Sequence, residues 1–230
     1  MRILLVAAVV AAVVAGWIGS PVASAQSACA DLGGTVNPDQ ICRVHAENDT
    51  YLLDFTFPAQ YPDQQAVADY LTQTRDGFVN VSGMPGSRGL PYVLDAEGTG
   101  YRSGLPLLGT ESLVFEVYQN VGGAHPQTWY RAFNWNHATR TPITFDSLFK
   151  PGTKPLDVIY PEVNRYLAVE QGLTDPIPQG AGLDSANYQN FALTDDTLFF
   201  FFGQGEMLAE SAGPVQASVP RAAVAPMLAL

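Results

Sequence analysis

Residues 191–202 read FALTDDTLFFFF and carry the clearest structural signal in the chain. Two apolar runs, Phe191–Thr194 and Thr197–Phe202, flank Asp195-Asp196, a pair typical of a tight hairpin turn. The second run is apolar on both faces of a strand, which is typical of a central strand that is covered on both sides. The stretch therefore predicts a β-hairpin inside a packed sheet.

Other parts of the chain also show strand patterns. Residues 51–57 alternate, with Tyr51, Leu53, Phe55 and Phe57 on one face. The remaining predicted strands are residues 92–101, 113–118, 129–135 and 215–219. Short connections favour antiparallel pairing between most sequence neighbours.

Two stretches show helical spacing. Pro62 is expected to open the first helix with Asp63 in its first turn, and its apolar stripe is Val67, Tyr70, Leu71, Thr74 and Phe78. The second stripe is Leu156, Ile159, Val163 and Leu167.

A glycine and a proline are expected to limit the second helix. It should end at Gly172, and Pro161 should kink or divide it. A short helix is expected over 220–230. The order of elements predicts a single α+β domain in which two principal helices pack on a mainly antiparallel sheet.

The N-terminus has the features of a Sec signal peptide. Arg2 precedes the unbroken apolar run Ile3–Val14, and Ala23-Ser24-Ala25 forms a small-x-small cleavage site. The run is too short to span a bilayer. We expect a signal peptide over 1–25 and a mature domain over 26–230 that is secreted, extracellular or associated with the cell wall, with no integral membrane segment after cleavage.

The two cysteines, Cys29 and Cys42, agree with export. An even number of cysteines in a secreted chain indicates a disulfide. Their spacing does not fit a redox C-x-x-C motif, and no histidine pair accompanies them to complete a zinc site. We expect a structural disulfide.

The charge balance excludes some partners. The chain holds 22 acidic and 11 basic residues, a formal net charge of −11. A phosphate backbone would be repelled, so we expect no nucleic acid partner. Electrostatic docking on an anionic membrane is disfavoured for the same reason.

Known catalytic and cofactor motifs are missing. The sequence has no G-x-S-x-G elbow, no H-E-x-x-H motif and no Gly-rich nucleotide loop. A calcium loop that began at Asp95 would place Pro106 at the position of its bidentate glutamate. We expect no metal and no cofactor.

Of the three histidines, His45, His125 and His137, only His125 lies in a glycine-rich connection between predicted strands. Gly122 and Gly123 permit positive φ, and Pro126 favours an extended His125. Residues Gly122, Gly123, His125 and Pro126 are therefore the candidate binding loop. His125 is the candidate catalytic base, with Ser147 or Ser211 as a possible nucleophile. The alternative is a turn histidine that hydrogen-bonds a nearby carbonyl.

Several longer motifs resemble a known family. The stretches are YPDQQ (61–65), QTRD (73–76), VYQNVGGAHP (117–126), PITFD (142–146) and NYQNFA (187–192). They resemble the secreted immunogenic proteins of mycobacteria, the skin-test antigen type, over nearly the whole mature chain. Residues 140–230, most clearly 191–220, are also similar to the extracellular domain of lysozyme-sensing anti-sigma factors and to some peptidoglycan deacetylases.

The resemblance implies a secreted α+β protein with one N-terminal disulfide, and it implies no catalytic residues. The leading hypothesis is an interaction protein of the mycobacterial envelope or host interface. A carboxylester hydrolase with a non-standard serine site is one alternative, and a lysozyme- or peptidoglycan-binding module is the other. The expected partners are a host protein, lysozyme or peptidoglycan, and the expected state is a monomer.

Overall fold

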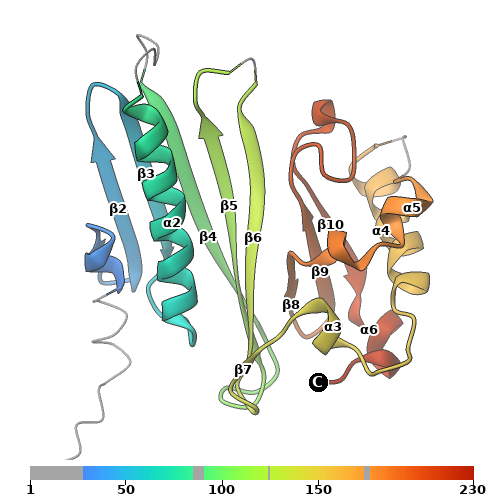
Figure 1. Ribbon diagram of the computed structural model, residues 1–230. Helices are drawn as coiled ribbons and strands as arrows, with labels where there is room; N and C mark the ends of the chain where they lie inside the picture. The colour runs from blue at the N-terminus through green and yellow to red at the C-terminus, as the bar shows by residue number, and fades with distance from the viewer. Residues whose placement is uncertain (1–27, 85–90, 124, 174–176) are drawn as a thin grey trace, which may run out of the picture.

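The computed structural model describes residues 28–84, 91–123, 125–173 and 177–230 (Figure 1). The predicted signal peptide and most of the loop expected between 82 and 91 lie outside the described residues. The described chain forms one seven-stranded sheet and one three-stranded sheet with a few helices, which confirms the α+β fold.

None of the described helices is both long enough and apolar enough to cross a membrane.

The larger sheet follows the chain in the order β1 to β7. Its strands are β1 (Thr35–Val36), β2 (Ile41–Glu47), β3 (Tyr51–Pro58), β4 (Tyr92–Ser103), β5 (Thr110–Asn120), β6 (Gln127–Asn136) and β7 (Thr141–Pro142). Neighbours pair antiparallel except β3 and β4, which are parallel. A parallel pair needs a crossover, and helix α2 (Gln64–Ser82) supplies it.

Helix α2 lies on one face of this sheet (Figure 1). Its stripe Val67, Leu71 and Phe78 is buried against the sheet, as predicted. The predicted start is wrong by two residues. The Asp63 carboxylate accepts a hydrogen bond from the backbone N–H of Ala66, so Asp63 caps the helix from outside its first turn.

The smaller sheet has the order β10-β9-β8, so the phenylalanine-rich strand is central, as predicted. Its strands are β8 (Phe191–Leu193), β9 (Thr197–Phe202) and β10 (Val215–Pro220). The helical segments around it are α3 (Phe145–Leu148), α4 (Leu156–Glu170), α5 (Gln179–Gly182), α6 (Arg221–Val224), η1 (Ser185–Tyr188), η2 (Glu210–Ala212) and η3 (Ala225–Met227).

The two faces of β9 join the layers of the molecule. Leu198, Phe200 and Phe202 pack in the core that α4 covers. Phe201 packs with Val114 of β5 on the opposite face. The resulting layers are α2, the larger sheet, the smaller sheet and α4 (Figure 1).

The structure corrects part of two helix predictions near prolines. Pro161 does not divide α4, which is continuous from 156 to 170. Proline at the sixth position removes a single helical hydrogen bond, and the buried stripe of α4 outweighs that loss. Gly172 has φ +68°, as expected just beyond a helix end. The helix expected over 220–230 is two short pieces, α6 and η3, and Pro226 lies in the second of them.

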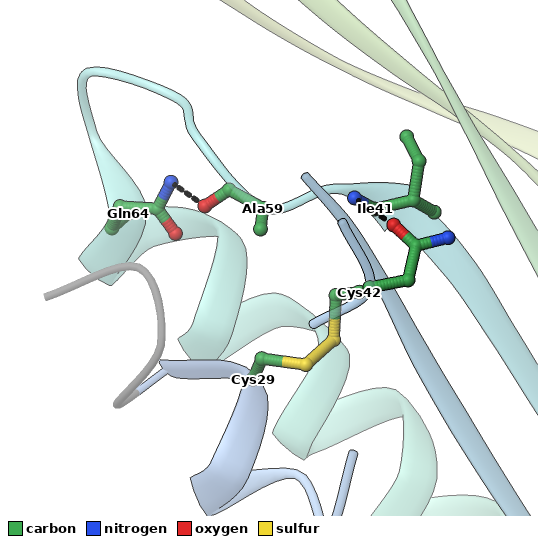
Figure 2. Close-up of a disulfide and its surroundings, with 6 residues drawn as sticks. Cys29, Ile41, Cys42, Ala59 and Gln64 are labelled. Atoms are coloured by element: carbon green, nitrogen blue, oxygen red, sulfur yellow. Dashed lines mark hydrogen bonds between the residues drawn. A yellow bond between two sulfur atoms is a disulfide. The ribbon is translucent and has the colours of Figure 1, made fainter. Parts of the chain in front are cut away.

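A disulfide joins Cys29 to Cys42 and ties the segment before β1 to strand β2 (Figure 2). Both cysteines are buried beside the core between α2 and the larger sheet. Gly34 lies against this bond, and a Cβ there would come within 2.7 Å of the Arg43 carbonyl oxygen. The disulfide is therefore packed in the core, as expected of a structural bond.

We predict that replacing both cysteines together, Cys29→Ala with Cys42→Ala, lowers the free energy of unfolding by about 3 kcal/mol, because the unfolded chain regains the freedom of a short loop. Urea denaturation of the variant beside the oxidised and reduced wild-type protein measures this. Reduced wild-type protein should match the variant. Three coincident curves would show that the bond contributes nothing to stability.

Candidate functional site

A cleft of about 660 Å³ opens between the start of α2 and the end of the larger sheet where β4 turns into β5. Tyr61 and Leu107 form part of its wall, and Arg102, Glu111 and His137 supply polar groups. An adjoining hollow of about 240 Å³ shares Arg102, Leu107, Glu111 and His137 with it. This double cleft is the candidate site.

The sheet register brings the polar groups together. Arg102 of β4 and Glu111 of β5 are directly paired across the strands. His137 follows the last residue of β6, and its backbone N–H donates to the Gly109 carbonyl at 2.9 Å. Strands β4 and β5 and the residue after β6 thus each contribute one side chain at the same end of the sheet.

Glu111 binds both basic neighbours. Its Oε2 lies 3.1 Å from His137 Nε2, and its Oε1 accepts a hydrogen bond from Arg102 Nη2 at 3.0 Å. The side chains of Glu111 and His137 are only 14% and 25% exposed. Because an ionised carboxylate only accepts, Nε2 carries the proton of a neutral His137 and Nδ1 carries the lone pair.

This arrangement is that of a general base oriented by a carboxylate. Nδ1 of His137 makes no hydrogen bond to any described residue, so it is available to a water molecule or a ligand. No serine or threonine hydroxyl among the described residues hydrogen-bonds any imidazole. Within that part of the chain, no hydroxyl is therefore hydrogen-bonded to an imidazole as the nucleophile of a serine hydrolase is.

Tyr61 adds a neutral donor to the cleft wall. Burial raises the pKa of Tyr61 above its usual range, and the nearby Asp63 and Glu111 carboxylates raise it further. The phenol therefore stays protonated at any physiological pH.

The predicted loop at His125 is the turn between β5 and β6. Gly122 has φ +73°, and its N–H donates to Asn120 Oδ1 at 3.0 Å. His125 and Pro126 are exposed, and His125 hydrogen-bonds no described residue. The role of His125 as a base stays a prediction.

The two serines considered with His125 have other surroundings. Ser147 closes the capping box of α3, where its Oγ accepts from the Thr144 N–H. Ser211 lies in η2. The structure brings neither into hydrogen-bonding contact with His125.

A second large cavity, of about 550 Å³, lies between α3 and α4. Both lysines of the chain, Lys150 and Lys154, line it beside Phe145 and Phe149. Its lining residues include the Asp146 and Asp157 carboxylates but no imidazole. Across the described residues, no group of three or more histidine, cysteine or acidic side chains is placed to hold a metal ion.

Sequence reasoning missed the His137–Glu111 pair because 26 residues separate its members. One signal was present. Glu111 shares a strand face with Leu113, Phe115 and Val117, so alternation places a carboxylate on an otherwise buried face. A charge in that position needs a partner and marks a candidate site.

Comparison with known proteins gives full-length relatives. The chain is 54% identical over 227 residues to esterase Rv3036c of Mycobacterium tuberculosis, covering 99% of both chains. It is 42% identical over 229 residues to immunogenic protein MPT64 of the same species, covering 100% of both. Peptidoglycan-N-acetylmuramic acid deacetylase PdaC of Bacillus subtilis is 26% identical over 106 residues, which are 44% of this chain and 22% of PdaC.

The fold also has matches. Residues 146–222 match the model of a family described as a protein of unknown function (DUF3298). A crystal structure of a DUF3298 family protein from Pseudomonas aeruginosa superposes with a TM-score of 0.55 at 14% identity, covering 84% of this chain and 95% of that one. This likeness concerns the fold alone.

A second hydrogen bond between a histidine and a carboxylate allows a direct test of how the carboxylate shifts the imidazole pKa. His45 of β2 and Asp54 of β3 are paired across the strands, with Nδ1 and Oδ1 2.7 Å apart. This hydrogen bond, and the attraction between the two groups, raise the pKa of His45 above 6.5. The pair's contribution to stability is therefore complete below the unfolded-state pKa and is lost as the pH rises through the folded-state pKa.

We predict that Asp54→Asn lowers the pKa of His45 towards 6.5, as followed by NMR titration of the imidazole ring. Asp95→Asn, which changes the neighbouring acidic position in β4, is the matched control and should move it much less. An unchanged His45 titration in Asp54→Asn would contradict the hydrogen bond.

Proposed function

The chain belongs to the family of its full-length relatives, the immunogenic protein MPT64 and esterase Rv3036c, and we propose that it is an exported hydrolase of carboxylic esters whose site is the His137–Glu111 cleft. The observation that carries this proposal is an imidazole held by a carboxylate inside an apolar-walled cleft. The name of the 54% identical relative supports the same activity.

The reaction uses water as the nucleophile. Nδ1 of His137 removes a proton from water as the water oxygen bonds to the acyl carbon, and Glu111 stabilises the imidazolium that forms. The tetrahedral intermediate then collapses with cleavage of the bond between carbon and alkoxy oxygen. The imidazolium returns its proton to the leaving alkoxide, so the products are a carboxylic acid and an alcohol.

Arg102 is placed to stabilise the developing oxyanion. Its Nε and Nη2 both face Glu111 Oε1, and Nη1 hydrogen-bonds no described residue. The Arg102 side chain lines the cleft and is 78% exposed, so a guanidinium N–H can donate to an ester carbonyl bound there, and such a bond strengthens as negative charge forms on that oxygen. The protonated Tyr61 phenol is a second donor at the cleft wall.

Export is part of the proposal. The signal peptide predicted over 1–25 and the buried disulfide both fit a protein that folds outside the cytoplasm. Binding without chemistry is the second candidate function, favoured by relatives that are named only as immunogenic proteins. The two candidates are separable because only one of them predicts turnover.

We predict that His137→Ala lowers kcat/KM for a short p-nitrophenyl ester by about 10²- to 10⁴-fold, since the general base is lost. Glu111→Gln should lower it less, because the imidazole stays but loses its orientation. The assay uses purified residues 26–230, with His45→Ala as the matched control for removing an imidazole. A fluorophosphonate should label no serine, because water is the nucleophile.

Three results would count against this mechanism. Stoichiometric labelling of one serine would replace water with a serine nucleophile. Loss of turnover in His125→Ala, with His137→Ala fully active, would move the site to the candidate loop. Absence of turnover in the wild-type protein would favour the binding function.

A further inference from the structure

The turn between β4 and β5 holds three leucine side chains in solvent. Residues 104–109, GLPLLG, form this segment, which we call the leucine loop. Leu105, Leu107 and Leu108 are 70%, 79% and 66% exposed. The loop lies at the lower end of the larger sheet in Figure 1, beside β7. Single exposed leucines are ordinary on protein surfaces, but a cluster of three in one turn marks a candidate interaction site.

Hydrogen bonds hold the leucine loop in this shape. The Leu108 and Gly109 N–H groups donate to the Leu105 carbonyl at 3.1 and 2.8 Å. The Gly104 N–H donates to Asp195 Oδ1 at 2.6 Å, which ties the loop to the smaller sheet. A Cβ at Gly109 would lie 1.9 Å from the Ser103 carbonyl oxygen, so the turn closes tightly.

The backbone of the loop is also strained. Leu107 has φ +72°, a region that leucine rarely adopts. The strained Leu107 backbone and the exposed leucine side chains both disfavour this loop conformation. The hydrogen bonds of the loop nevertheless hold it. A loop built in this way presents its side chains outward instead of collapsing onto the protein.

The leucine loop borders the candidate site. Leu107 lines both parts of the double cleft. The Gly109 carbonyl accepts the hydrogen bond that anchors the His137 backbone. An apolar chain that contacts the loop therefore lies next to the His137–Glu111 pair.

We propose that the leucine loop inserts into the surface of an uncharged lipid assembly, and that acyl esters in this surface are the substrates of the cleft. The second clause rests on the proposed function, whereas insertion does not. Three leucines offer only a few hundred Å², less than the roughly 800 Å² that each partner buries in a stable protein interface. The net charge of −11 opposes anionic lipid, so an uncharged surface is the occupant that fits.

Flotation with phosphatidylcholine vesicles tests insertion without any ester turnover. The test variant carries Leu105→Ser, Leu107→Gly and Leu108→Ser together. Glycine adopts φ +72° without strain, so this variant should unfold at the same temperature as the wild-type protein or higher. Its partition onto vesicles should fall by about tenfold or more. Val81→Ser with Val169→Ser, which changes exposed apolar residues elsewhere, is the matched control and should float like the wild-type protein.

The outcomes separate the two proposals. Wild-type protein that does not float, or a loop variant that floats equally well, overturns insertion whatever the esterase assay shows. A dimer in sedimentation that the loop variant abolishes would also overturn it, because the loop would then bind a second copy.

If insertion holds, the wild-type protein should hydrolyse an emulsified long-chain ester, and the loop variant should lose more activity on the emulsion than on a soluble ester. Flotation without any turnover would instead reject the proposed hydrolase and leave a lipid-binding protein.

Discussion

The fold depends on the burial of strand β5 on both of its faces. Leu113, Phe115 and Val117 face α2, and Ser112 and Val114 face the smaller sheet. The Ser112 hydroxyl accepts a hydrogen bond from the Leu193 N–H, so the second contact is directional as well as apolar. A one-residue slip of β5 would exchange its two faces and break both layers at once. The same register pairs Arg102 with Glu111, and the core therefore also positions the polar end of the cleft.

Strong apolar patterns were readable from the sequence alone. The hairpin at 191–202 and the stripe of α2 were predicted because each buries a nearly uninterrupted apolar face. Strand β2 and the two-residue strands β1 and β7 were missed. The inward residues of β2, Cys42, Val44 and Ala46, are small and alternate with charged ones, so its position depends on pairing with β3 rather than on its own composition.

The candidate site was harder to predict than the fold. Sequence reasoning weighs a histidine by its neighbours along the chain, and a glycine-rich setting drew attention to His125. In the structure, the candidate histidine is identified by its contacts across neighbouring strands. The ends of β4, β5 and β6 place Arg102, Glu111 and His137 together. No local motif encodes such a contact. The one available sign was the glutamate on the apolar face of β5, which is informative only once that face is known to be buried.

The two hydrogen-bonded imidazole–carboxylate pairs among the described residues show why environment, and not contact alone, separates a candidate site from a surface ion pair. His45 and Asp54 are closer together than His137 and Glu111, but both lie largely in solvent, which screens their attraction. Around His137, the sheet, the start of α2 and the leucine loop exclude part of that solvent, so charges formed there interact more strongly. Lipid that covered the open side of the cleft would remove further solvent. The strained, exposed leucines would then do more than attach the protein to a surface, because covering the cleft would strengthen the stabilisation of the imidazolium by Glu111 on which the proposed hydrolysis depends.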